Sequence, residues 1–174
     1  MQRNPYVLPV KRYGNEHNPK LVILLCNPGD DPLKYERLSD YTMFLDDKYK
    51  DAGLSLDIAC KYNDWWDEFF TVFKQVKLKP SDTLVLEYYP YHTCDMSLVP
   101  DYNQWTDYAK KALSENEKLL SKFMSKNVPV FGYYHSHWLR DVPELKDYKL
   151  FYKSRARFKT HKIKELHQFL QEVL

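Results

Sequence analysis

Four short segments of the chain gather polar and aromatic side chains of the kinds that carry chemistry. They are residues 27–31 (Asn-Pro-Gly-Asp-Asp), 87–93 (Glu-Tyr-Tyr-Pro-Tyr-His-Thr), 133–137 (Tyr-Tyr-His-Ser-His) and 153–157 (Lys-Ser-Arg-Ala-Arg). Amides orient water, carboxyl and imidazole groups move protons or bind metals, and guanidinium groups bind phosphate. Each segment follows an apolar run, so one site can draw on all four.

A metal-dependent small hydrolase is one function that these residues allow. Its ligands would be the acids and histidines of the first three segments, namely Asp30, Asp31, His92, His135 and His137. The pair His135 and His137 supplies only two ligands, and no motif supplies the third. We therefore expect no metal ion, and the metal-dependent hydrolase stays open as an alternative.

The cysteines predict neither a zinc site nor a disulfide framework. Cys26, Cys60 and Cys94 are odd in number, far apart and never in CxxC spacing, which is typical of a reduced intracellular protein. Cys26 lies inside an apolar run and is expected to be a buried core thiol. Neither a Walker loop nor a GxGxxG motif occurs, so we expect no cofactor.

Apolar runs and amphipathic segments alternate along the chain. The runs expected to be strands are continuous rather than alternating, as in buried parallel strands, and they span residues 21–26, 83–86, 128–133 and 149–152. The segments expected to be helices carry apolar residues at helical spacing, and they span residues 63–76, 102–125 and 163–174. This alternation predicts an α/β protein with a mostly parallel sheet.

The chain of 174 residues suits one domain, for which we expect residues 1–174, with residues 1–17 as an N-terminal extension. The predicted architecture is a three-layer α/β/α domain with a four-stranded, mostly parallel sheet. Ligands of such sheets bind beyond the carboxyl ends of the strands, where the four chemical segments begin. No apolar run approaches the roughly 20 residues of a membrane helix, so no membrane association is expected.

The charge is unevenly distributed although the net charge is only +2. Residues 30–68 hold eleven acids and five bases, whereas residues 149–164 hold seven lysines and arginines and no acid. A basic segment of this density binds phosphates or forms a solvated face, and both interpretations stay open.

Residues 21–29, Leu-Val-Ile-Leu-Leu-Cys-Asn-Pro-Gly, resemble the first motif of the uracil-DNA glycosylase superfamily. The resemblance is closest to its mismatch-specific and single-strand-selective branches, in which an apolar strand ends in Asn-Pro-Gly. The aromatic segment 64–70 (Asp-Trp-Trp-Asp-Glu-Phe-Phe) matches the family's Phe-Trp helix, and residues 18–174 fit its order of elements. The resemblance implies hydrolysis of the N-glycosidic bond of a flipped base in DNA, and strands in the spatial order 2-1-3-4.

The resemblance also implies roles for individual residues near the first motif. Asn27 matches the residue that positions water at the sugar carbon, with Pro28 and Gly29 beside the base. Tyr41, or else Phe44, matches the ring that stacks on the flipped base. Without the resemblance, Asn27 is a turn former that closes the strand, and the two aromatic residues belong to the core.

Glu87 departs from the family pattern. Its position is often an Asn that reads the edge of uracil with one donor and one acceptor. An ionised carboxylate accepts hydrogen bonds but cannot donate one to a carbonyl group. Its charge also opposes the negative charge on a departing uracil, so uracil is a doubtful substrate unless Glu87 is protonated or turned away.

The last family motif, His-Pro-Ser or Asn-Pro-Ser, is also altered. Residues 152–158 read Tyr-Lys-Ser-Arg-Ala-Arg-Phe, in which Ser154 fills the serine role but the His or Asn is missing. His92, from another strand end, is the candidate replacement donor. The residues expected to hold the nucleic-acid backbone are Lys153, Arg155, Arg157 and Lys159.

We therefore expect a DNA-glycosylase-like protein acting on a base in single- or double-stranded DNA, with uracil not assumed. Because of the two departures, retained catalysis is an open question. The first alternative is a catalytically silent member of the fold that binds nucleic acid or a protein partner. The expected state is a cytoplasmic monomer, associated with the nucleoid if it binds DNA.

Overall fold

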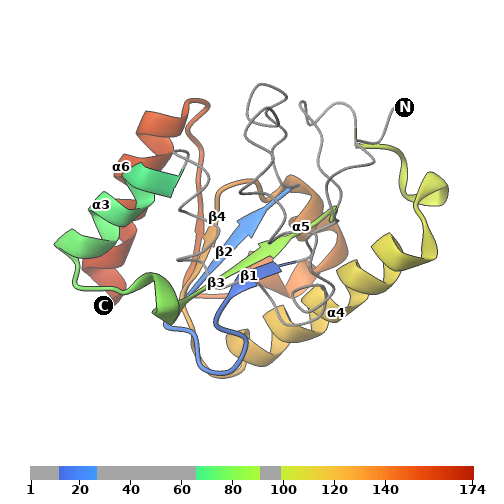
Figure 1. Ribbon diagram of the computed structural model, residues 1–174, viewed down its shortest axis with the longest axis horizontal. Coiled ribbons are helices and arrows are strands. Elements are labelled where there is room, and N and C mark those ends of the chain that lie inside the picture. The colour runs from blue at the N-terminus through green and yellow to red at the C-terminus, as the bar shows by residue number, and fades with distance from the viewer. Residues whose placement is uncertain (1–11, 27–65, 91–98) are drawn as a thin grey trace, which may run out of the picture.

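The computed structural model describes residues 12–26, 66–90 and 99–174. Within these ranges the chain forms a mixed five-stranded sheet with helices packed on both sides (Figure 1). The α/β class expected from the sequence is confirmed. In the same ranges, no helix is long and apolar enough to cross a membrane.

The sheet contains four parallel strands and one antiparallel edge strand. The strands are β1 (Arg12–Gly14), β2 (Leu21–Leu25), β3 (Thr83–Glu87), β4 (Val130–Gly132) and β5 (Phe151–Lys153). Their spatial order is β1-β3-β2-β4-β5. The pairs β2–β3, β2–β4 and β4–β5 are parallel, so the four parallel strands follow the order 2-1-3-4 when they are numbered along the chain.

The expected count of four strands is wrong, because β1 pairs antiparallel with the outer side of β3. This strand lies within the range expected as an N-terminal extension. Its three residues, Arg-Tyr-Gly, contain no apolar run that could indicate a strand. Gly14 has a φ of +91°, and a Cβ atom there would lie 2.1 Å from the Thr83 carbonyl oxygen, so the close approach of β1 requires glycine.

Helices α3 (Asp67–Gln75) and α6 (Lys159–Val173) cover one face of the sheet (Figure 1). Their apolar stripes pack on the odd-numbered residues of β2 and on neighbouring strands. The buried members of this cluster include Ile23, Leu25, Phe69, Phe73, Phe131, Leu166 and Phe169. Burial of this apolar area is the main force that holds the face together.

Helices α4 (Asp107–Met124) and α5 (Ser136–Asp141) cover the other face, which completes three layers (Figure 1). The second core cluster includes Val22, Leu24, Leu86, Leu120, Phe123 and Trp138. The Thr106 side chain caps α4 by accepting a hydrogen bond from the Ala109 amide. Helix α5 has six residues, too few for a periodic pattern, and the sequence did not predict it.

Candidate functional site

The carboxyl ends of the four parallel strands meet at one edge of the sheet, as expected from the sequence. Leu25 of β2 lies in register with Glu87, Leu24 with Gly132, and Gly132 with Lys153. Main-chain hydrogen bonds continue just beyond the strands, from Tyr88 to Leu25, Tyr89 to Cys26, Tyr134 to Leu24 and Ser154 to Gly132. Paired strand ends that are 21 to 108 positions apart in sequence are therefore brought to one edge, which we call the carboxyl edge.

Alternation along the strands divides the side chains of this edge between the two faces. Val85 and Phe131 pack on the α3 and α6 side. Glu87 comes two residues after Val85, and Tyr133 two residues after Phe131, so both point to that same side. Tyr88 lies in the cluster on the opposite side, with α4 and α5. Glu87 and Tyr133 thus share one face.

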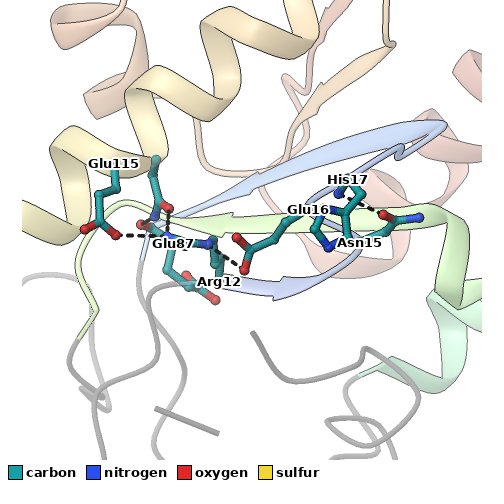
Figure 2. Close-up of polar contacts among 7 residues, drawn as sticks. Arg12, Asn15, Glu16, His17, Glu87 and Glu115 are labelled. Atoms are coloured by element: carbon teal, nitrogen blue, oxygen red, sulfur yellow. Dashed lines mark hydrogen bonds and ion pairs between the residues drawn. The ribbon is translucent and has the colours of Figure 1, made fainter. Parts of the chain in front are cut away.

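Glu87 is the buried acid at the end of β3. The residue is 1% exposed, and among the described residues its Oε2 has no hydrogen-bond partner. Burial raises the pKa of Glu87 well above its ordinary value, because the ionised form has lost its hydration. In Figure 2 no dashed line joins the Glu87 carboxyl group to Arg12. Burial thus favours the protonated carboxyl group, which can donate and accept a hydrogen bond.

A buried polar network fixes the main chain at Glu87 (Figure 2). The Asn116 side-chain amide of α4 donates to the Glu87 carbonyl oxygen at 2.9 Å. Arg12 donates to the Asn116 side-chain oxygen at 3.3 Å and pairs with Glu16 at 2.8 Å and Glu115 at 3.3 Å. Arg12 lies level with Leu86 and contacts α4, and within the described residues the Glu87 side chain takes part in none of these ion pairs.

A second buried group, Lys162 of α6, lies at the end of β4. Its Nζ donates to the Tyr133 carbonyl oxygen at 2.7 Å and lies 4.2 Å and 3.8 Å from the ring centroids of Tyr133 and Tyr134. Burial raises the pKa of Tyr134, with a smaller effect of the neighbouring Cys26. Cys26 itself is buried, as predicted, and burial raises the pKa of its thiol to about 12, so it is a poor nucleophile.

The segment after β5 combines one buried residue with several exposed ones. The buried Ser154 hydroxyl donates to Glu165 of α6 at 2.5 Å, so its proton is held inside the protein. Lys153, Arg155 and Arg157 are exposed, and within the described part of the chain none of them has an ion-pair partner. Lys159, by contrast, pairs with Glu68 at 2.8 Å.

Phe158, at the start of α6, is 63% exposed beside these cations. The Arg157 guanidinium carbon lies 5.9 Å from its ring centroid, and His161 contacts the ring edge-on at 6.2 Å. An exposed aromatic ring among exposed arginines suits contact with stacked bases and phosphates.

The two histidines that a metal site would share have different partners. His135 Nδ1 lies 3.2 Å from the Gly132 carbonyl oxygen, whereas His137 stacks on the Tyr88 ring with centroids 5.0 Å apart. Burial lowers the pKa of both rings. Among residues 12–26, 66–90 and 99–174, no three acidic, histidine or cysteine residues are grouped as metal ligands.

Several residues that the sequence singled out lie outside the described ranges. They are the first-motif residues, the stacking candidates, the replacement donor and the two aspartates, namely Asn27, Pro28, Gly29, Tyr41, Phe44, His92, Asp30 and Asp31. Two of the expected substrate-binding residues, Glu87 and Ser154, lie at the carboxyl edge. Cys26, the last described residue of the first motif, lies at the same edge.

Three buried polar residues were not predicted from the sequence, namely Arg12, Asn116 and Lys162. A signal existed for two of them. Asn116 falls on the apolar stripe of α4, and Lys162 falls one turn before Leu166 on the stripe of α6. A polar side chain on an apolar stripe indicates a buried interaction.

Comparisons with known proteins assign no family to this site. No family model matches the chain, and no curated protein matches it. Its function must follow from the chemistry of its residues.

Proposed function

We propose that this chain is a uracil-DNA-glycosylase-like protein that binds a flipped base in DNA and hydrolyses its N-glycosidic bond. The observation that carries the proposal is the buried Glu87 carboxyl group, whose Oε2 has no partner in the described part of the chain and whose pKa is raised by burial. An unpartnered polar group inside a protein costs about 1–3 kcal/mol, which a ligand that hydrogen-bonds to it would offset.

A protonated Glu87 offers one donor and one acceptor, as an asparagine amide does. That pair complements the O=C–N–H edge of uracil or hypoxanthine. It also places no negative charge beside a departing base. Protonation therefore answers both objections that an ionised Glu87 raises against uracil.

The exposed cations after β5 supply the second supporting observation. Lys153, Arg155 and Arg157 lie at the strand end next to the β4 end, and Phe158 extends from the same segment. Phosphates would hold the DNA there while the aromatic ring contacts its bases. Lys159 contributes less than the sequence indicated, because Glu68 neutralises it.

The remaining roles rest on the resemblance alone. Asn27 would position the water, Pro28 and Gly29 would lie beside the base, and Tyr41 or Phe44 would stack on it. His92 would donate a proton or hydrogen bond in place of the missing motif residue.

The direct test is base release from oligonucleotides that carry uracil or hypoxanthine, single- and double-stranded. Wild-type protein should release at least one of these bases, whereas Asn27→Ala should still bind but not release it. Glu87→Ala should lose release, and Glu87→Gln should keep it because the amide retains donor and acceptor. Release that is equal in all variants would contradict the assignment.

Replacing Arg155 and Arg157 by alanine should weaken DNA binding and its salt dependence. Each phosphate contact contributes a slope of roughly −0.7 to −0.9 in log K against log salt, so the double variant should lose about 1 to 2 units of slope. Titration of fluorescent DNA with the protein at several salt concentrations measures this slope. The matched control is Lys126→Ala, an exposed lysine after α4. An unchanged slope would make the segment a solvated face.

A catalytically silent nucleic-acid-binding protein is the second candidate. The observation that favours it is the Ser154 hydroxyl, whose proton is committed to Glu165. Salt-dependent binding without release of any base would decide for this candidate.

A further inference from the structure

Lys162 is the buried amine of the carboxyl edge. Only 6% of the residue is exposed, in the first turn of α6. Its Nζ atom is held by the Tyr133 carbonyl oxygen and by two tyrosine rings, with Tyr134 itself 37% exposed. The amine is therefore fixed in place within a few ångströms of an exposed ring.

The surroundings of Lys162 do not neutralise its charge by an ion pair. In the described part of the chain no carboxylate lies within ion-pair distance of Nζ, and Glu165, one turn further along α6, accepts from Ser154. Among the described residues, Lys162 contacts the rings of Tyr133 and Tyr134, and its charge also acts on His135.

Burial lowers the pKa of Lys162 to about 8, with Glu165 opposing the effect in part. At pH 7 about a tenth of the amine is thus uncharged and carries a free lone pair, and this fraction rises with pH. Lysines of this kind react with carbonyl groups.

The position of Lys162 relates it to Glu87. Gly132 pairs with Leu24, so the next residue, Tyr133, lies level with Leu25. Leu25 in turn pairs with Glu87 on its other side. The strand ends at Glu87 and Tyr133 are two strand spacings apart, about 10 Å, which is comparable to the length of a nucleoside. A nucleoside with its base at Glu87 is therefore long enough to extend its sugar toward Lys162.

We propose that Lys162 is an amine nucleophile that forms an imine with the C1′ aldehyde of an abasic deoxyribose in DNA. The Nζ lone pair forms the bond to C1′, and the carbonyl oxygen leaves as water with the two protons that the amine loses. The proposal rests on the proposed function for the source of the abasic site. Its test does not, because the abasic site can be made beforehand.

The experiment incubates the protein with an oligonucleotide that carries a preformed abasic site, in the presence of cyanoborohydride, which reduces an imine to a stable amine. A covalent protein–DNA adduct that maps to Lys162 by mass spectrometry is expected. Lys162→Met and Lys162→Arg should each abolish it, while Lys164→Met, at an exposed position on the same helix, should not. An adduct that survives Lys162→Met would overturn the proposal.

A measurement on the unmodified protein covers the case in which the variants fold poorly. Formaldehyde with cyanoborohydride methylates reactive amines, and Lys162 should react at least as fast as Lys164 despite its burial. Its rate should rise with pH with a midpoint near the value of about 8. A folded protein in which Lys162 stays unmodified would overturn the proposal, whereas failure of base release alone would count against only the proposed function.

Discussion

The Glu87→Gln variant should become progressively more stable than the wild-type protein as the pH rises above about 4.5. The ordinary pKa of the Glu87 carboxyl group is 4.5, and burial raises it well above that value in the folded state. Between the two values the unfolded chain has released the proton and the folded chain keeps it, so the wild-type free energy of unfolding falls with rising pH. Glutamine does not titrate and lacks this loss.

The difference in the free energy of unfolding between Glu87→Gln and wild type should widen by up to about 1.4 kcal/mol per pH unit. Urea unfolding at several pH values measures it, and all other titrating groups cancel in the difference. The control is Glu172→Gln, which makes the same substitution at an exposed position on α6. Parallel profiles of Glu87→Gln and wild type would mean that Glu87 is ionised in the folded protein.

The same titration should appear in base binding. In the wild-type protein, affinity for a base with an O=C–N–H edge should fall as the pH rises through the raised pKa of Glu87, because the ionised group no longer donates. In Glu87→Gln the affinity should not show this fall. A joint loss of affinity in both proteins would assign the titration to another group.

Trp138→Ala should strongly destabilise the protein. Trp138 is completely buried on α5, and its indole N–H donates to the Leu25 carbonyl oxygen at 2.7 Å. Its ring also packs edge-on against Tyr88 at 5.6 Å. Removing a buried aromatic side chain costs about 3–5 kcal/mol, because the packing is lost and a cavity remains.

Two further variants separate the causes of this loss. Trp138→Phe keeps an aromatic ring but removes the hydrogen bond, and since Leu25 also accepts from the Tyr88 amide, the added loss from the hydrogen bond should be about 0.5–1.5 kcal/mol. Phe158→Ala, at an exposed position, should change stability by less than about 0.5 kcal/mol. Urea unfolding followed by circular dichroism measures all three. Equal stabilities of Trp138→Ala and Phe158→Ala would contradict the packing described for α5.

The sequence by itself determined the α/β class, the four parallel strands and the three long helices. Each of these is a local signal: a strand buried on both faces is a continuous apolar run, and a surface helix carries an apolar stripe. Glu87 was placed at a strand end for the same reason, since the apolar run 83–86 stops there. The expected strand order came from the resemblance and agrees with the order of the parallel strands.

Only the tertiary structure decided the features that depend on contacts between residues distant in sequence. Strand β1 has three residues and exists because it pairs with β3, about 70 positions along the chain. Arg12 is buried because it meets Asn116 and Glu115 of α4, and Lys162 is enclosed because α6 packs against the end of β4. The raised pKa of Glu87 and the lowered pKa of Lys162 have the same origin. Both depend on the removal of water by segments distant in sequence, and the ionisation of a side chain follows its hydration rather than its neighbours along the chain.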